Sequence, residues 1–499
     1  MTEPHRRPMA RIHIESRECS PELLERLTGA TYFPERLLGP ALVGTVGRAG
    51  GHLMYVTAPS MIDVTEQVDY YLGLLGGGVR ATGAESMRRM RGLVTITPID
   101  DDSTRWLSTK VLDPVNPQAA EVRRRLRDFT ALHRAAGSDV RLSYFEPSEP
   151  LENLARELGI PGNQPAAAHI PLGTKHSSRE IFAAAGVPVP RGTGVCYDLH
   201  TLAEAIARLA ADGVRELVLK LDSSAFGGGL GNALLTLDPH IAAPDGEGTA
   251  ERVVRALPGA ALMDPKLSWH EYVTLMKETG VIAEEMIAGE PLLSPSFQGR
   301  LTEHGTVRAV STHDQVLAGN AQSYQGCAFP ADAAYRSQLV AHGLRVGEVL
   351  RERGLGRGGF GVDFLATRAG AGWRLLGCEI NLRETATKHP FTMAAALLGT
   401  APTDDGRFVV DGTEYVYEAS DVLMDPRYKG LRPSQLIAAV TGSPIGYDPV
   451  RRTGVVLHMM SAVTEYGKFG AVSIARDRAE ASSLMAELRD RVAQLAPLG

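Results

Sequence analysis

Two neighbouring apolar segments constrain the fold of this 499-residue chain more than any other feature. Residues 361–366 read Gly-Val-Asp-Phe-Leu-Ala, and residues 373–383 read Trp-Arg-Leu-Leu-Gly-Cys-Glu-Ile-Asn-Leu-Arg. This pattern predicts two antiparallel strands joined by a short hairpin loop. Because side chains alternate along a strand, Glu379, Asn381 and Arg383 share a face that Asp363 of the partner strand can reach.

Two carboxylates and one amide oxygen on a shared face form a set of hard oxygen ligands. Such ligands suit Mg²⁺ ions that bridge nucleotide phosphates. We therefore predict that Asp363, Glu379 and Asn381 bind metal. The alternative is that these residues are polar side chains on the solvated face of a hairpin, and their spacing alone leaves both readings open.

A glycine-rich loop follows a second predicted strand, residues 216–221. Lys220 lies near the end of this strand, and residues 223–232 read Ser-Ser-Ala-Phe-Gly-Gly-Gly-Leu-Gly-Asn. An ammonium group and free backbone N–H groups can bind phosphate oxygens. The candidate phosphate-binding residues are Lys220, Ser223, Ser224, Gly227, Gly228 and Gly229. A flexible linker is the alternative, and the loop fits neither the Walker nor the dinucleotide-binding pattern.

Two further segments carry candidate nucleotide ligands. Lys175 begins a predicted helix and is one of only eight lysines beside 44 arginines, so each lysine is informative. Residues 281–290 form an apolar strand with acidic residues in it and after it. That strand could present backbone groups to an adenine and a carboxylate to a ribose, through Glu284, Glu285, Met286, Ile287 and Glu290.

Composition and charge narrow the class of protein. A net charge of −6 gives no basic field for nucleic acid, and no apolar stretch is long enough to span a membrane. The beginning of the chain has no apolar core of a signal peptide, and the four cysteines lie far apart. We therefore expect a cytoplasmic α/β protein of several domains, with neither disulfides nor thiolate metal sites.

The periodicity of apolar residues predicts further elements along the chain. Besides those above, strands are expected at residues 10–14, 52–56, 92–96 and 306–312. Helices are expected at residues 21–27, 64–75, 120–133, 176–185, 199–211 and 478–495.

The order of these motifs resembles the ATP-grasp superfamily, in which ATP lies between two α+β lobes. The resemblance implies that Lys175 and Lys220 contact phosphates, that residues 284–287 form the adenine hinge and that Glu290 meets the ribose. It also implies that Asp363, Glu379 and Asn381 hold two Mg²⁺ ions, which Mn²⁺ can replace. Arg383 then faces the transferred phosphoryl group or the acyl phosphate.

A narrower resemblance, to peptide ligases of the pheganomycin-ligase type, covers nearly the whole chain. It rests on residues 32–38, 54–57, 68–72, 311–317, 324–330, 453–458 and 465–470. It implies a pre-ATP-grasp α/β domain at residues 1–168 and an ATP-grasp core at 169–400 with a lid at about 190–285. A small C-terminal α/β domain at 401–499 completes the expected organisation. The sequence leaves open whether the protein forms a homodimer.

One segment departs from this family. Members carry Gly-Gly-Thr-Thr-His-Pro after the arginine, whereas residues 384–390 here read Glu-Thr-Ala-Thr-Lys-His-Pro. We therefore expect Lys388 to lie beside an acyl phosphate. His389 and His313 are candidates for assisting deprotonation of an amine.

These observations predict an ATP-dependent ligase that joins a carboxylate to an amine through an acyl phosphate. The expected substrates are amino acids or short peptides from natural-product biosynthesis. A γ-glutamyl ligase that uses the side-chain carboxylate of glutamate is an alternative within the family. A carboxylate kinase, a ligase with a non-amine nucleophile and an inactive nucleotide-binding regulator are the competing functions.

Overall fold

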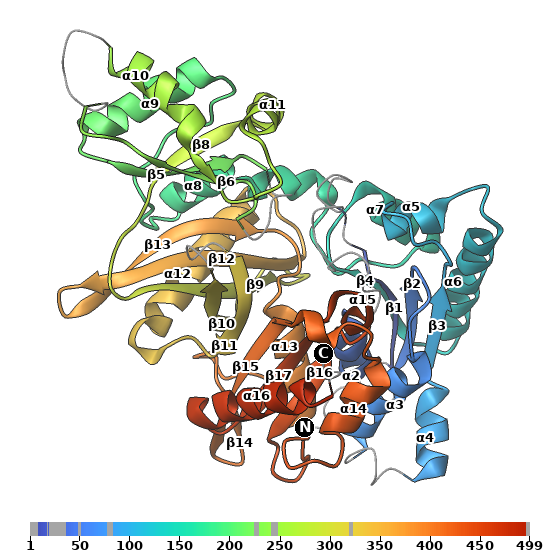
Figure 1. Ribbon diagram of the computed structural model, residues 1–499. Helices are drawn as coiled ribbons and strands as arrows, with labels where there is room; N and C mark the ends of the chain where they lie inside the picture. The colour runs from blue at the N-terminus through green and yellow to red at the C-terminus, as the bar shows by residue number, and fades with distance from the viewer. Residues whose placement is uncertain are drawn as a thin grey trace.

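The fold is seen in a computed structural model that describes residues 8–16, 18, 36–47, 51–76, 83–223, 229–240, 248–318 and 323–495. Ser224, Gly227 and Gly228 of the predicted phosphate loop, and the predicted helix at 21–27, lie outside these residues. The expected α/β class is confirmed. Three sheets organise the described chain (Figure 1).

The N-terminal unit is a parallel sheet in the order β3-β2-β1-β4, covered by helices. Its strands are β1 Met9–Ile14, β2 His52–Thr57, β3 Val94–Pro98 and β4 Asp139–Tyr144. Its helices are α2 Leu38–Val46, α3 Val64–Leu75, α4 Ala84–Arg91, α5 Leu107–Leu112, α6 Pro117–Ala135 and α7 Glu149–Leu158. A parallel sheet needs helical cover because both of its faces are apolar.

The segment expected to form the lid, which we call the lid, is a small antiparallel sheet in the order β7-β6-β5-β8. Its elements are α9 Leu199–Ala211, β5 Glu216–Leu221, β6 Asn232–Thr236, α10 Thr249–Ala256, β7 Ala261–Leu262, α11 Trp269–Thr279 and β8 Val281–Glu285. Figure 1 shows the lid, in green, at one end of the molecule, above the strands of the core.

The third sheet is antiparallel and forms the core in the order β13-β12-β9-β10-β11-β15-β17-β16. The segment expected to form the ATP-grasp core contributes α8 Lys175–Ala184, β9 Leu292–Leu301, β10 Val307–Ala318, β11 Ser323–Phe329, α12 Ala333–Glu352, β12 Gly358–Ala369, β13 Gly372–Asn381 and α13 Lys388–Leu398. The expected strands at 361–366 and 373–383 are thus a pair at one edge of this sheet.

The C-terminal segment continues the core sheet. Its elements are β14 Phe408–Val410, β15 Thr413–Met424, α14 Pro433–Val440, β16 Gly454–His458, α15 Ala462–Tyr466, β17 Lys468–Ala475 and α16 Arg478–Ala493. Strand β15 pairs with β11, so strands on both sides of the expected boundary at residue 400 share one ladder. One apolar cluster also joins Leu42 and Tyr71 of the N-terminal unit to Met393 and Phe469.

Two local features fix the position of Lys175. Helix α8 begins at this residue because the hydroxyl of Thr174 accepts a hydrogen bond from the backbone N–H of Ser177 at 3.2 Å. One turn further along the same face of the helix, the backbone N–H of Ile380 in β13 donates to the hydroxyl of Ser178 at 3.1 Å. Lys175 is therefore held against the strand that carries the predicted metal ligands.

The contact between β11 and β15 allows a test of the continuous sheet. A Cβ atom at Gly326 would lie 2.1 Å from the backbone oxygen of Ala419, a clash that only movement of one strand relieves. Overpacking typically destabilises a protein by roughly 1–3 kcal/mol, and we expect Gly326→Ala to cost at least this much. Gly356→Ala is the matched control, because nothing lies within 4 Å of its added Cβ. Urea unfolding measures both, and equal midpoints would contradict the role of this pairing.

Candidate functional site

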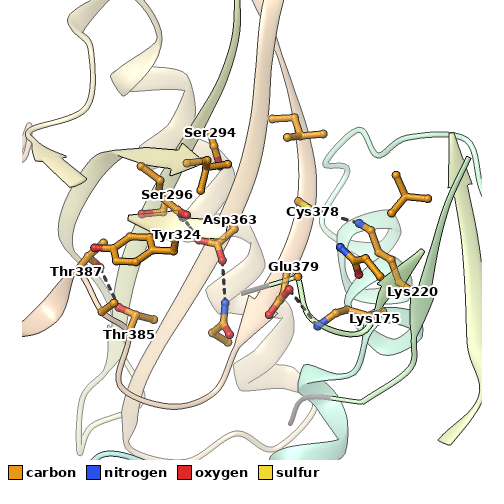
Figure 2. Close-up of a pocket in the computed structure, with 18 of the residues that line it drawn as sticks. Lys175, Lys220, Ser294, Ser296, Tyr324, Asp363, Cys378, Glu379, Thr385 and Thr387 are labelled. Carbon is orange, nitrogen blue, oxygen red and sulfur yellow. Dashed lines mark hydrogen bonds and ion pairs between the residues drawn. The ribbon is translucent and has the colours of Figure 1, made fainter. Parts of the chain in front are cut away.

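A cavity of about 520 Å³ lies where the lid, the core sheet, the N-terminal unit and the C-terminal strands meet. Figure 2 shows side chains from the lid and from the core sheet facing each other across it. The sequence-predicted residues that line the cavity are Lys175, Lys220, Gly229, Glu284, Glu285, Met286, Ile287, Asp363, Glu379, Asn381 and Arg383. The structure thus brings together most of the residues that the sequence singled out.

Two acidic side chains face each other on the edge strands. Asp363 of β12 lies directly opposite Glu379 of β13, and the register shifts by one residue just after this pair, so that Cys378 forms a bulge. The amide nitrogens of Asn381 and Gln315 donate to the two oxygens of Asp363, at 2.9 and 2.6 Å. Burial and the neighbouring charge of Glu379 raise the pKa of Asp363 to about 7.

Lys175 compensates the second carboxylate. Its Nζ lies 3.0 Å from Oε2 of Glu379, and both side chains are largely buried. Burial alone would raise the pKa of Glu379, but the charges of Lys175 and Arg383 outweigh burial and lower that pKa. Among the described residues the ammonium of Lys175 has no hydrogen-bond acceptor with good geometry. It can therefore donate to an anionic ligand in the cavity.

Lys220 is held by a buried carboxylate on the lid. Its Nζ donates to Oε2 of Glu284 at 2.5 Å, and Nη1 of Arg179 donates to Oε1 of the same residue at 2.5 Å. Burial alone would raise the pKa of Glu284, but the charges of Lys220 and Arg179 lower it. Glu284 therefore positions a lysine, a role that the sequence-based adenine assignment did not include.

Arg383 lies at the opposite end of the acidic face. Its Nε is 3.6 Å from Oε1 of Glu146, and its guanidinium lies 6.0 Å from the centroid of the Phe145 ring. Both partners come from the segment after β4 of the N-terminal unit. The N-terminal unit therefore forms part of the site wall.

Several predicted residues do not reach the cavity. His313 is buried beside Tyr417, whose hydroxyl lies 2.7 Å from its Nε2, and burial lowers the pKa of His313 to about 3. His389 is buried as well, with Nε2 at 2.8 Å from Asp421. Glu290 is exposed, and neither it nor Ser223 is among the cavity-lining residues.

The ammonium of Lys388 pairs with Glu384 and likewise lies outside the cavity lining. Glu384 is buried and also accepts hydrogen bonds from Asn163 at 3.0 Å and from Gln164 at 2.6 Å. Lys388 thus neutralises a buried carboxylate that ties the N-terminal unit to the core. This geometry favours a positioning role over the direct contact with an acyl phosphate that the sequence suggested.

The structure also places residues in the cavity that sequence reasoning missed. Arg36, Gln315, Asp421 and Lys468 line it, and Ser296 adds a buried hydroxyl with no hydrogen-bond partner among the described residues. For Lys468 a signal existed, because it is one of the eight lysines. Asp421 gave no signal, because it lies in an apolar strand pattern that carries no motif.

The opposing carboxylates predict a stability change that depends on pH. The pKa of Asp363 rises from 3.8 to about 7 on folding, so its ionised form destabilises the folded state progressively from pH 4 to pH 7 and fully above pH 7. We expect Asp363→Asn to raise the unfolding temperature of the metal-free protein at pH 8, and to raise it less at pH 5.

Glu379→Gln is the comparison for this test, because it should change the unfolding temperature in the opposite direction. The ionised form of Glu379 is stabilised by Lys175, so removing its charge strands a buried ammonium. We expect the unfolding temperature of this variant to fall at pH 8. Calorimetric scans in a chelator measure both variants, and a lower temperature for Asp363→Asn at pH 8 would refute the charge assignment.

The donor set of the cavity fits a magnesium–nucleotide ligand. Asp363, Glu379 and Asn381 supply hard oxygens that Mg²⁺ prefers. Lys175 and the hydroxyl of Ser296 are buried groups with unused hydrogen-bonding capacity. A magnesium-bound polyanion would satisfy the oxygen ligands through its metal, and Lys175 and Ser296 through its own oxygens.

Comparisons with known proteins identify the family and the fold. A family model described as the PGM1 C-terminal domain matches residues 435–488. L-Propargylglycine–L-glutamate ligase of Streptantibioticus cattleyicolor is 31% identical over 473 residues, which cover 93% of this chain and 90% of that protein.

Solved structures share the fold. The biotin carboxylase domain of Hydrogenobacter thermophilus 2-oxoglutarate carboxylase, in complex with MgADP, ADP and bicarbonate, matches with a TM-score of 0.52 and 15% identity, over 97% of this chain and 90% of that one. N5-carboxyaminoimidazole synthetase from Staphylococcus aureus matches with a TM-score of 0.51 and 12% identity, over 97% and 98%. The described residues contain no helix with both the length and the apolarity to cross a membrane. The chain belongs to the ATP-grasp superfamily and, within it, to the pheganomycin-type family of acid–amino-acid ligases.

Proposed function

We propose that this ligase uses ATP to activate the carboxylate of one amino acid as an acyl phosphate, and then joins it to the amine of a second amino acid or short peptide. The observation that carries the proposal is the convergence of Lys175, Lys220 and Arg383 with three oxygen-bearing side chains in one cavity. Carboxylates and amines do not condense usefully in water, so phosphoryl transfer must come first.

The residues predicted from the sequence have the following parts in this proposal. Lys175 and Lys220 bind the phosphates of the nucleotide, and Met286 and Ile287 line its adenine end. Asp363, Glu379 and Asn381 hold Mg²⁺, which neutralises phosphate charge when bound. Ser223 and Ser224, with the glycines of the loop at 223–232, are proposed to close over the phosphates, and Glu290 to approach the ribose.

The chemistry needs positioning and charge neutralisation more than covalent catalysis. A carboxylate oxygen attacks the γ-phosphorus of ATP, and the bond between this phosphorus and the bridging oxygen breaks to release ADP. The amine then attacks the acyl carbon, inorganic phosphate leaves, and the ammonium proton is lost to solvent or to phosphate. Arg383, held by Glu146 and Phe145, faces the oxygens on which negative charge develops.

A γ-glutamyl ligase is the second candidate, favoured by one specific finding. The relative that is 31% identical is named for L-propargylglycine and L-glutamate. We propose glutamate and a non-proteinogenic amino acid as a substrate pair on that ground. Glutamine and isoglutamine each block one carboxylate of glutamate, so comparing them identifies which carboxylate is activated.

The proposed metal ligands predict loss of the first chemical step. We expect Glu379→Gln and Asn381→Ala to lower ADP formation by more than about 100-fold, the upper end for outer-shell partners of a metal. Glu352→Gln, on the exposed end of α12, is the control and should retain activity. Near-wild-type turnover of either variant at saturating Mg²⁺ would rule out the metal assignment.

A substrate screen tests the reaction itself. The protein is incubated with ATP, Mg²⁺ and pooled amino acids that include L-glutamate and L-propargylglycine, and ADP and new masses are followed together. A ligase forms ADP and a condensed product in equal amounts. ADP with no condensed product would indicate a carboxylate kinase, and the absence of both would support a regulator that has lost turnover.

A further inference from the structure

The end of the cavity near the N-terminal and C-terminal segments carries a second group of charges, which the proposed reaction does not use. Arg36 precedes α2, Asp421 lies on β15 and Lys468 begins β17. All three line the cavity, and we call them the charged wall. Arg36 and Lys468 lie in two of the motifs on which the family resemblance rests, at residues 32–38 and 465–470. The nucleotide site does not explain these two motifs.

A β-bulge brings Asp421 to this wall. Between the pairs Ser420–Ala471 and Leu423–Phe469, strand β15 has one residue more than β17. The hydroxyl of Ser420 accepts a hydrogen bond from the backbone N–H of Val422 at 3.2 Å, which satisfies a donor left out of the ladder. Bulges re-aim side chains next to functional sites. The irregularity therefore accounts for the position of the Asp421 side chain at the cavity.

Two buried histidines hold the carboxylate of Asp421 in place. Nε2 of His389 lies 2.8 Å from its Oδ1, and Nε2 of His458 lies 3.2 Å from the same oxygen. Burial alone would raise the pKa of Asp421, but His389 and His458 lower it, so the carboxylate is ionised. His389 thus acts on the cavity through Asp421, which makes it a positioning residue.

The cations of the wall outnumber its carboxylate. Nη2 of Arg36 is 3.9 Å from Oδ2 of Asp421, too far for a hydrogen bond, although Arg36 is only 7% exposed. Its guanidinium lies instead over the Phe145 ring, 4.3 Å from the centroid. Lys468 forms no ion pair with a carboxylate of the described residues, and its pKa is lowered by burial. A buried cation without a hydrogen-bonded anion is costly, so this wall is suited to an anionic ligand.

We propose that Arg36 and Lys468 bind the free α-carboxylate of an amino-acid substrate, and that Asp421 faces the α-ammonium group of the same molecule. The proposal deepens the proposed function, on which it rests, by assigning a subsite for an amino acid. A carboxylate matches the two cations, and Asp421 selects ligands that also carry a positive charge.

The position of Phe145 connects this subsite to the reacting end of the cavity. Arg36 and Arg383 both lie against its ring, at 4.3 and 6.0 Å from the centroid. One amino acid anchored at Arg36 therefore has its other end near Arg383. The anchored molecule is either the carboxylate donor, activated at its side chain, or the amine acceptor, and the experiment below distinguishes them.

A metal is a poorer match for the same place. Ligand atoms of His389, Asp421 and His458 lie within 4.8 Å of one another, as a metal site requires. However, Arg36 and Lys468 adjoin Asp421 and would repel a cation. Nε2 of His389 is also already hydrogen-bonded to Oδ1 of Asp421, at 2.8 Å.

Ligand-induced stabilisation tests the subsite without catalysis. Unfolding temperatures are measured for the wild type, Arg36→Met, Lys468→Met and Lys468→Arg, with and without Mg²⁺ and a non-hydrolysable ATP analogue. The probes are L-propargylglycine and the proteinogenic amino acids, L-glutamate among them, each beside its α-carboxamide. Lys429→Met, an exposed lysine of the same C-terminal segment, is the matched control.

We expect at least one amino acid to stabilise the wild type and the Lys429→Met control, and its α-carboxamide to fail. Arg36→Met and Lys468→Met should lose this stabilisation, and Lys468→Arg should keep part of it because the charge remains. The free Lys468→Met protein should be no less stable than the wild type, since a half-buried charge with no ion pair among the described residues has been removed. That result excludes misfolding as the cause.

Kinetics with the substrates from the screen identify the anchored partner. Both Met variants should raise KM roughly 10- to 100-fold for one amino acid, with little change in kcat and in KM for ATP. When that amino acid is supplied as its α-carboxamide, the wild type and the variants should react equally poorly. When the other partner is supplied as its α-carboxamide, the wild type and the variants should still differ.

Two outcomes would overturn the subsite. One is that no amino acid stabilises the wild type, and the other is that the Met variants keep wild-type stabilisation and KM. The proposed function fails separately, because a wild type that binds an amino acid through Arg36 and Lys468 but forms no amide would keep the subsite and lose the ligase.

Discussion

The opposition of two partly buried carboxylates on adjacent strands is the constraint on which the rest of this site depends. Asp363 and Glu379 face each other in direct register, and each would be costly to bury alone. The surrounding residues supply what the pair needs: two amide donors for Asp363 and an ammonium for Glu379. The remaining imbalance is seen in the raised pKa of Asp363, and a divalent cation bound there would remove it.

Several cations in and beside this site are held by carboxylates other than Asp363 and Glu379. Glu284 fixes Lys220 and Arg179, Glu146 holds Arg383, and Glu384 holds Lys388. In each case a buried or partly buried acid sets the position of a longer, flexible basic side chain. Such pre-organisation matters for phosphoryl transfer, in which placement of charge provides most of the catalysis.

The continuous core sheet explains how segments far apart in the chain reach one cavity. Because β11 pairs with β15, the strands that carry Asp363 and Glu379 belong to the same sheet as the strands that carry Asp421 and Lys468. The N-terminal unit closes the same cavity through Arg36 and Phe145. The expected division into three domains describes the order of the chain but not the construction of the site, to which all three segments contribute.

The sequence by itself determined the elements whose signal is local. The strand pair around residue 370 follows from alternation, and the helices at 64–75 and 199–211 from apolar periodicity. The proposed metal ligands and phosphate-binding lysines could be predicted because Asp363, Glu379, Asn381, Lys175 and Lys220 fall within such elements and line one cavity. Only the tertiary structure decided that His313 and His389 are buried beside Tyr417 and Asp421, and that Lys388 neutralises Glu384. It alone decided that Asp421, placed by a bulge, meets Arg36 and Lys468. The physical reason is that periodicity fixes which face of an element a side chain occupies, whereas its partner across the fold depends on register shifts and packing between segments hundreds of residues apart.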